Sequence, residues 1–133
     1  MIYTSYFARI KDLPPNVIPV SIAGKAPDWY NGIEYKVLAP KYDFFMKYKE
    51  DHDEGHYRKC YKEQVTDLLD PIIVAKDMAS LGENVALLCY EKPEDFCHRH
   101  LVGKWLDEHG IPCEEYAFEE QRKIRSRIDT GEL

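Results

Sequence analysis

The sequence predicts a single α/β domain built on a mostly parallel β-sheet with helices on both faces. Its 133 residues, 44% of them apolar, are enough for one compact domain with one core. The run Val85–Tyr90 is apolar without alternation, as expected for a strand covered on both faces in a parallel sheet. Strand and helix patterns also alternate along the chain, which is the order of an α/β layer architecture with right-handed crossovers.

Three other segments have strand patterns. Ile2–Phe7 is a β-branched and aromatic run, and Val17–Ile22 is a second run that lies between a Pro-Pro-Asn turn and an Ala-Gly pair. Pro112–Phe118 is a weaker pattern that follows the helix stop His109-Gly110. We therefore expect Val85–Tyr90 to be the central strand, with the other three around it.

The spacing of apolar residues predicts helices between these strands. Tyr42–Lys49 is a short helix, and Tyr57–Met78 has helical spacing that Pro71 should interrupt. Phe96–His109 is the strongest helix because its apolar residues share one face: Leu101, Val102, Trp105 and Leu106. We expect the domain to span residues 1–118 and residues 119–133, with four acidic and four basic side chains, to form a charged tail.

Charge and composition exclude several classes of protein. With 24 acidic against 18 basic residues, the net charge of -6 argues against sequence-independent nucleic-acid binding. No window approaches the roughly 18 consecutive apolar residues of a membrane helix, and the first residues lack the pattern of a secretion signal. We therefore expect a cytoplasmic protein without membrane contact. In that reducing compartment its four cysteines are expected to be free thiols: Cys60, Cys89, Cys97 and Cys113.

Reactive side chains cluster directly after the predicted central strand. Within eleven residues lie two thiols, a carboxylate, an imidazole and a guanidinium: Cys89, Glu91, Cys97, His98 and Arg99. Ligands of open parallel sheets bind beyond the carboxyl ends of the strands, so this is the predicted catalytic site. Asp95, or a residue just before Pro93, is expected to cap the next helix. Either cap would leave the second thiol and the imidazole in the first two helical turns, where an anion is stabilised.

This stretch resembles the family called domain of unknown function 488. The resemblance rests on Leu88–Pro93, Phe96–Leu101, Trp105-Leu106 and Gly110, with looser matches at Thr4-Ser5-Tyr6, Tyr35, Leu38–Pro40, Tyr57 and Tyr61. It spans residues 1–118 and implies a small Rossmann-like fold, but no activity, because the family has none established. Many members carry an Asp and an Arg near the end of the second strand. Val20–Lys25 lacks both, and Lys25 is the candidate to replace the Arg.

Each residue of the cluster has a functional and a structural interpretation. Cys89 is a nucleophile or redox thiol, with Cys97 as the alternative nucleophile, or else Cys89 is a small buried hydrophobe. Glu91 is a general base or substrate-binding carboxylate, or else it forms an ion pair with Arg99, which in the functional interpretation holds a substrate anion. His98 shuttles a proton, or else it is a hydrogen-bonded core histidine. A phosphate cradle like that of cysteine phosphatases is disfavoured, because the loop has no glycine and three acidic residues.

A zinc site is the main rival to a thiol site. Cys89, Cys97 and His98 offer three ligands, with Cys60 or Cys113 as a fourth. The chain has no Cys-x2-Cys pair, however, and adjacent residues such as Cys97 and His98 project about 100° apart on a helix. The sequence therefore favours a site without a metal and without another cofactor.

Four further residues are predicted to bind the substrate. Lys25, Trp29 and Tyr30 follow the second strand, where the two aromatic rings stack on a flat ring such as a base, or else close the core. Ser5 offers a hydroxyl from the first strand.

The leading hypothesis is an enzyme with thiol-dependent hydrolase or transferase chemistry on a small polar or nucleotide-like substrate. The alternative is a non-catalytic module that binds such a ligand in the same pocket.

Overall fold

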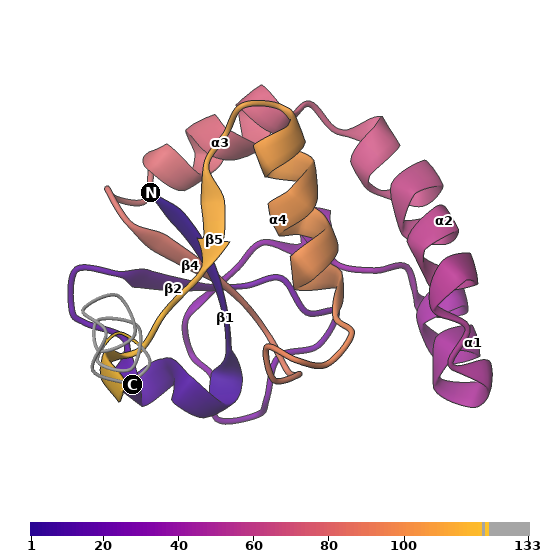
Figure 1. Cartoon of the computed structure of the whole chain (residues 1–133), viewed down its shortest axis with the longest axis horizontal. Coiled ribbons are helices and arrows are strands. Elements are labelled where there is room, and N and C mark those ends of the chain that lie inside the picture. Colours follow the sequence, from indigo (N-terminus) through magenta and orange to yellow (C-terminus); the bar gives the residue numbers. More distant parts are fainter. Residues whose placement is uncertain (121, 123–133) are drawn as a thin grey trace, which may run out of the picture.

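The computed structural model describes residues 1–120 and residue 122, and in this part of the chain five strands form one wholly parallel sheet (Figure 1). The strand order is β3-β2-β4-β1-β5. The bounds are β1 (Ile2–Tyr6), β2 (Ile18–Ser21), β3 (Ile33–Glu34), β4 (Val85–Cys89) and β5 (Cys113–Glu115). The central strand β4 is buried at every position, as its apolar run predicts. The α/β fold class is confirmed, and the arrangement is consistent with a small Rossmann-like fold.

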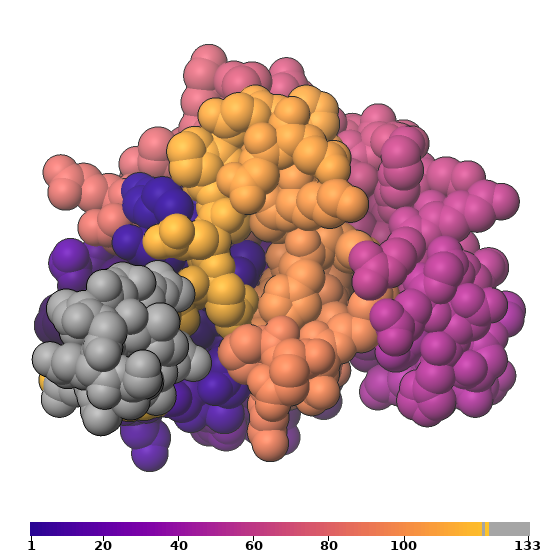
Figure 2. All heavy atoms as spheres, viewed as in Figure 1, coloured from indigo at the N-terminus to yellow at the C-terminus, as the bar shows by residue number. Residues whose placement is uncertain are grey.

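Within the described residues, four α-helices and three 3-10 helices connect the strands. The α-helices are α1 (Tyr42–Asp51), α2 (Glu54–Gln64), α3 (Pro71–Ala79) and α4 (His98–Glu108); the 3-10 helices are η1 (Phe7–Asp12), η2 (Lys36–Leu38) and η3 (Thr66–Leu68). In the space-filling view α4 lies over the middle of the molecule, with α1 and α2 at one side (Figure 2). None of the helices in the described part is long and apolar enough to cross a membrane.

The two faces of the sheet are covered by different elements. Val85 and Leu87 of β4 belong to the larger core, which includes Phe44 of α1, Tyr61 of α2, Val74 of α3 and Val102 of α4. Ala86 and Leu88 belong to a smaller core with Phe7 of η1, Tyr116 and Phe118. Helices therefore lie on both faces, but the four α-helices share one of them.

The order of the strands explains this division. The connections from β3 to β4 and from β4 to β5 run in one direction across the sheet, whereas those from β1 to β2 and from β2 to β3 run in the other. Crossovers of one handedness that run in opposite directions must cover opposite faces. The segments after β2 and after β4 therefore leave the same edge toward opposite faces, which opens a crevice between them.

The structure corrects three details of the predicted elements. The break at Pro71 is confirmed, since Pro71 opens α3 after the N-cap Asp70, but the preceding helix already ends at Gln64. The strand β3 and the helix η1 have no clear sequence pattern and were not expected. Helix α4 begins at His98 with Cys97 as N-cap, not with Asp95, because the backbone N–H of Asp95 donates to the Lys92 carbonyl in a turn before the helix. The expected charged tail lies mostly outside the described residues.

Candidate functional site

A cavity of about 730 Å³ lies at the carboxyl edge of the sheet, in the crevice between the segments that follow β2 and β4. Its walls include Ala23, Gly24 and Lys25 after β2, Pro40 to Lys49 around the start of α1, and Cys89, Tyr90, Glu91 and His98. The Tyr90 hydroxyl donates to the Lys25 carbonyl at 2.6 Å, which ties the two strand-end segments together. The edge that the sequence singled out is therefore hollow and carries reactive side chains.

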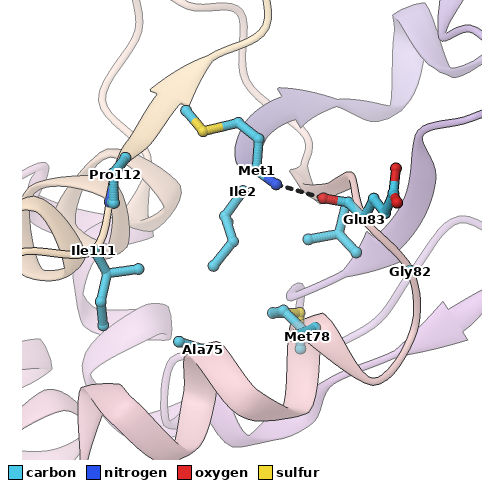
Figure 3. A pocket seen from close by; sticks show the side chains of 10 residues that line it. Met1, Ile2, Ala75, Met78, Gly82, Glu83, Ile111 and Pro112 are labelled. Atoms are coloured by element: carbon cyan, nitrogen blue, oxygen red, sulfur yellow. Dashed lines mark hydrogen bonds between the residues drawn. The ribbon is translucent and has the colours of Figure 1, made fainter.

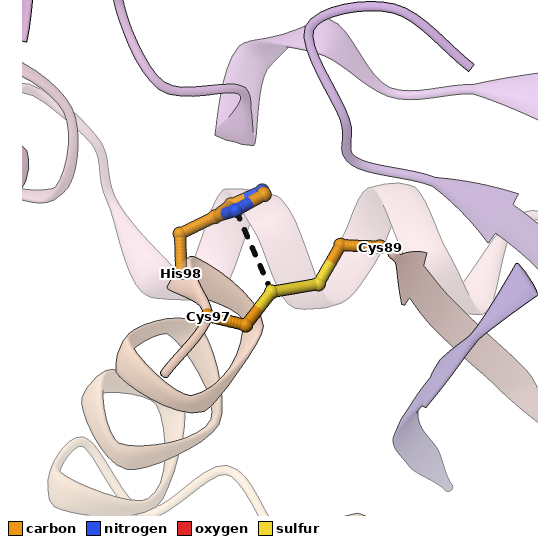
Figure 4. Close-up of side chains that lie close together, drawn as sticks. All are labelled: Cys89, Cys97 and His98. Carbon is orange, nitrogen blue, oxygen red and sulfur yellow. Dashed lines mark hydrogen bonds between the residues drawn. A yellow bond between two sulfur atoms is a disulfide. The ribbon is translucent and has the colours of Figure 1, made fainter. Parts of the chain in front are cut away.

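The expectation of four free thiols is wrong for the two cysteines at this edge. A disulfide joins Cys89, the last residue of β4, to Cys97, whereas Cys60 and Cys113 are free (Figure 4). Cys97 has extended backbone angles at the N-cap of α4, so its side chain turns back toward the end of β4 instead of following the helix. Both sulfurs are buried beside the imidazole of His98.

His98 is held in one tautomer by the backbone. Its Nε2 lies 2.8 Å from the Ile22 carbonyl oxygen, which only accepts, so Nε2 carries the proton and Nδ1 is left with its lone pair. That Nδ1 lies 3.9 Å from the Cys97 sulfur. Burial, together with the positive charge of Arg99, lowers the pKa of His98 to about 4, although the Ile22 hydrogen bond opposes this shift. The imidazole is therefore neutral near pH 7 and faces the sulfurs as an acceptor.

Arg99 provides the positive charge at this site. It is fully buried, and its Nη1 donates to the Cys89 sulfur at 3.2 Å and to the Glu91 carbonyl oxygen at 2.6 Å. The ion pair with the Glu91 carboxylate, which was the structural interpretation of Glu91, does not form, and Arg99 pairs with Glu115 instead. Nε and Nη2 each donate to a carboxylate oxygen of Glu115 at 3.0 Å, and Thr4 donates to the same carboxylate at 2.7 Å. The guanidinium is thus fixed against the Cys89 sulfur, and Arg99 does not line the cavity.

The other predicted residues fall into two groups. Glu91 and Lys25 are exposed and line the cavity. Ser5 does not lie there, because it alternates in step with Tyr3 and Phe7 and faces the smaller core, where its hydroxyl is buried without a hydrogen-bond partner. Trp29 and Tyr30 make edge-on contacts with Phe7 of that same core, and the Tyr30 hydroxyl donates to the Ile33 carbonyl at 2.6 Å. The structure therefore separates Ser5 and both aromatic rings from the thiols.

Four residues of the site were not predicted from the amino-acid sequence. Glu115 closes the Arg99 contact from β5, and Tyr42, Phe45 and Lys49 of α1 form a wall of the cavity. The one signal for Glu115 was its place in a predicted strand, since the end of any parallel strand reaches the same edge. The α1 residues had no such signal, because α1 precedes β4 by some thirty positions and its place depends on tertiary packing.

A second cavity of about 730 Å³ lies at the opposite edge of the sheet (Figure 3). Its walls are largely apolar: Met1, Ile2, Ala75, Met78, Val85, Ile111 and Pro112. Glu83 is its one ionisable side chain, and the chain's amino terminus donates to the Glu83 carbonyl oxygen. No nucleophile or imidazole lines this cavity, in contrast to the cavity at the carboxyl edge.

Fold and site together define a small parallel α/β protein with a cysteine, histidine and arginine cluster at the carboxyl edge of its sheet. The chain belongs to the family described as the active DUF488-N3 subclade, whose model matches residues 6–110. This match confirms the resemblance to domain of unknown function 488. It covers Cys89, Cys97, His98 and Arg99 but not Glu115. Comparisons with curated proteins and with solved structures found no match.

Proposed function

We propose that the protein is an enzyme that uses the reduced thiolate of Cys89 as a nucleophile on a small anionic, nucleotide-like substrate. The observation that carries this proposal is the contact of Arg99 with the Cys89 sulfur, 3.2 Å from Nη1, at the wall of the carboxyl-edge cavity. A buried sulfur that receives a hydrogen bond from a fixed cation is stabilised as a thiolate. That arrangement activates Cys89 as a nucleophile, which is more than a small hydrophobic side chain packed in the core would require.

The charges around Arg99 support this role. Glu115 binds the edge of the guanidinium that is formed by Nε and Nη2 and fixes the group, while Nη1 still points at Cys89. The neutral imidazole of His98 offers its free Nδ1 as an acceptor, 3.9 Å from the Cys97 sulfur. Glu91 is exposed at the cavity, where it can accept a proton from a bound water or a second substrate.

The cavity walls support the proposed class of substrate. Lys25 and Lys49 are exposed at its rim and offer two positive charges to an anionic group. Tyr42 and Tyr90 line the same cavity and are 77% and 49% exposed, so their rings are open to stacking on a flat base. A nucleotide has both features.

The proposed reaction proceeds in two balanced steps. The Cys89 thiolate attacks the electrophilic centre of the substrate, a new bond to sulfur forms, and the leaving group departs with the electrons of its former bond. Water or an acceptor then attacks the same centre, loses its proton to a base such as Glu91, and releases the thiolate. Because the nucleophile must be reduced, we also propose a cytoplasmic location, where thiols are kept reduced.

Alkylation of the reduced full-length chain tests the nucleophile without knowledge of the substrate. The protein is treated with iodoacetamide at pH 7 in the presence of a chelator, and each cysteine is followed by peptide mass spectrometry. We expect Cys89 to react faster than Cys60, although Cys60 is the more exposed of the two. Cys113 is an internal control, because burial raises the pKa of its thiol to about 12. Faster alkylation of Cys60, with Cys89 unreactive, would contradict the proposal.

A panel of nucleoside mono-, di- and triphosphates tests the substrate class. Turnover measured by chromatography should fall by about 10³ or more in Cys89→Ser, which removes the nucleophile. Glu91→Gln is the matched variant for the base. It removes the Glu91 carboxylate but keeps the contact of the Glu91 backbone carbonyl oxygen with Arg99. If the nucleotides raise the melting temperature of the wild type and of Cys89→Ser equally and none is turned over, the protein is a binding module and not an enzyme.

A further inference from the structure

We propose that the reduced protein binds one zinc ion between Cys89 Sγ, Cys97 Sγ and His98 Nδ1, and that this ion inhibits the enzyme by occupying its nucleophile. The inhibition rests on the proposed function, but the metal site itself does not. Both thiols and the imidazole are buried, and one possible ligand atom from each lies within 4.8 Å of the other two. Within the described residues this is the one group of three such side chains.

The structure removes the main objection that the sequence raised against a metal. Cys97 and His98 would project about 100° apart if both were helical. Cys97 is instead the extended N-cap residue, with φ -155° and ψ 145°, and only His98 is inside α4. The Cys97 sulfur therefore lies 3.9 Å from His98 Nδ1, and both face the end of β4 (Figure 4).

The surroundings of the three ligands suit a metal. A ligating histidine normally donates its other ring N–H to a carbonyl or carboxylate, and His98 Nε2 already lies 2.8 Å from the Ile22 carbonyl oxygen. This contact leaves Nδ1 free to bind. Zn²⁺ with two thiolates and a neutral imidazole has no net charge, and Glu115 offsets the charge of the neighbouring Arg99. The buried site would therefore contain no unpaired charge.

The backbone leaves room for an ion once the disulfide is reduced. A phosphine reductant delivers two electrons and water two protons, so that two thiols and a phosphine oxide result. Two thiolates on one tetrahedral zinc ion have their sulfurs ~3.8 Å apart, given bonds of about 2.3 Å. The Cα atoms of Cys89 and Cys97 are 7.4 Å apart, which allows this separation by side-chain rotation. Binding then displaces the thiol protons to solvent.

The fourth position of a tetrahedral ion would open toward the cavity, since Cys89 and His98 both line it. Three protein ligands with one open position is the arrangement of accessible zinc sites, in contrast to closed structural sites. Thiolate and imidazole ligands select zinc and similar soft cations over Mg²⁺. Zinc binding would thus be reversible, and the ion would compete with the substrate for the Cys89 sulfur.

Cobalt(II) in place of zinc tests the site directly. The full-length chain, reduced with a phosphine, is titrated with Co²⁺, and thiolate-to-cobalt charge-transfer bands and tetrahedral d–d bands are recorded. We expect one equivalent to bind, Zn²⁺ to displace it, and the oxidised chain to bind none. Cys97→Ser and His98→Gln should each weaken binding by at least about tenfold. A folded, reduced wild type without these bands would overturn the proposal, whatever the variants do.

Cys60→Ser is the matched control, because Cys60 and His56 form the other cysteine and histidine contact, 3.4 Å between Sγ and Nε2 on α2. Loss of cobalt binding in Cys60→Ser, with binding kept in Cys97→Ser, would place the ion on α2 and overturn the proposal. Zinc should also protect Cys89 from iodoacetamide, and equal protection by Mg²⁺ would count against a thiolate site. Cobalt bands, together with no nucleotide turnover by the reduced chain in the presence of a chelator, would refute the proposed enzyme but not the metal site. Nucleotide turnover without the cobalt bands would refute the metal site but not the proposed enzyme.

Discussion

The two edges of the β-sheet enclose cavities of the same volume, about 730 Å³ each, with different chemistry. The cavity at the amino edge is walled by aliphatic side chains such as Ile2, Ala75 and Met78. The cavity at the carboxyl edge contains a cysteine, an imidazole, a carboxylate and two lysines. Both edges belong to the same five strands, so neither strand composition nor cavity size distinguishes them.

The difference lies in the segments that connect the strands. At the carboxyl edge the segments after β2 and β4 depart to opposite faces and leave room for polar side chains, and the first residues of α4 point back into that room. At the amino edge the chain enters the strands from the ends of α3 and α4, and apolar residues close the core. The direction of the connections, and not the cavity volume, therefore accounts for the different linings of the two cavities.

The largest effect is expected at Arg99. Arg99→Gln removes the contacts with Cys89 and Glu115 and leaves the partly buried Glu115 carboxylate without its cation, which should cost about 3 to 5 kcal/mol of unfolding free energy. At the other edge Glu83→Gln, an exposed change, should alter it by no more than about 0.5 kcal/mol. Urea unfolding of the two variants measures both values. Equal effects would mean that Arg99 is not the structural centre of the carboxyl edge.

The next effect concerns the pH dependence that His98 imposes on this edge. Folding lowers the pKa of His98 from 6.5 to about 4, so the unfolded chain binds a proton in this interval that the folded chain does not. Its contribution to stability is complete above pH 6.5 and is lost as the pH falls toward 4, up to about 3 kcal/mol in all. His98→Gln should cost about 1 to 2 kcal/mol at pH 7 and remove this loss.

Unfolding curves of the wild type and His98→Gln, recorded between pH 4 and 7 with a chelator present, give the difference between the two proteins. Other groups that titrate in this interval, such as His100, are present in both and cancel. If the unfolding free energies of the two proteins changed in parallel with pH, His98 would be accessible to protons in the folded state and folding would not lower its pKa.

A pair of cavity-filling variants separates the two edges with a smaller effect. A Cβ atom added at Gly24 meets nothing within 4 Å, so Gly24→Leu should narrow the carboxyl-edge cavity at little cost in stability. We expect alkylation of Cys89 to slow by about tenfold, equivalent to ~1.4 kcal/mol in activation free energy. Ala75→Leu should instead add about 1 kcal/mol of stability at the apolar edge and leave alkylation unchanged. Slower alkylation in Ala75→Leu would show that the two edges are coupled.

The smallest effect is expected with duplex DNA. The lysines at the carboxyl-edge cavity suit one small anion, but the chain as a whole has a net charge of -6. Binding to random duplex at physiological salt should therefore be no tighter than the usual non-specific range of about 10⁻⁴ to 10⁻⁶ M. Fluorescence anisotropy with a labelled duplex measures it, and submicromolar binding would refute the view that the lysines act only locally.

The elements with strong patterns could be predicted from the amino-acid sequence alone. The unbroken apolar run of β4 required burial on both faces, and the shared face of Leu101, Val102, Trp105 and Leu106 required a helix packed against the sheet. The cluster from Cys89 to Arg99 was also visible, because a strand end followed at once by a helix start places its residues close together by chain connectivity alone. The short strand β3 could not be predicted, because two exposed residues have no periodic pattern.

The use that the protein makes of this cluster depends on tertiary packing. The N-cap position of Cys97, and with it the disulfide and the approach to His98, depends on one turn around Lys92 and Asp95 that no periodicity encodes. The partner of Arg99 comes from β5, sixteen residues away, because strand order places β5 beside β1. Ser5 faces the smaller core, on the face of the sheet opposite the α-helices, because the side chains of a strand alternate between the two faces. Which residues of β1 point to which face depends on how the helices cover the sheet. Local patterns specify elements, whereas contacts between distant elements depend on their packing, and the chemistry of this site consists of such contacts.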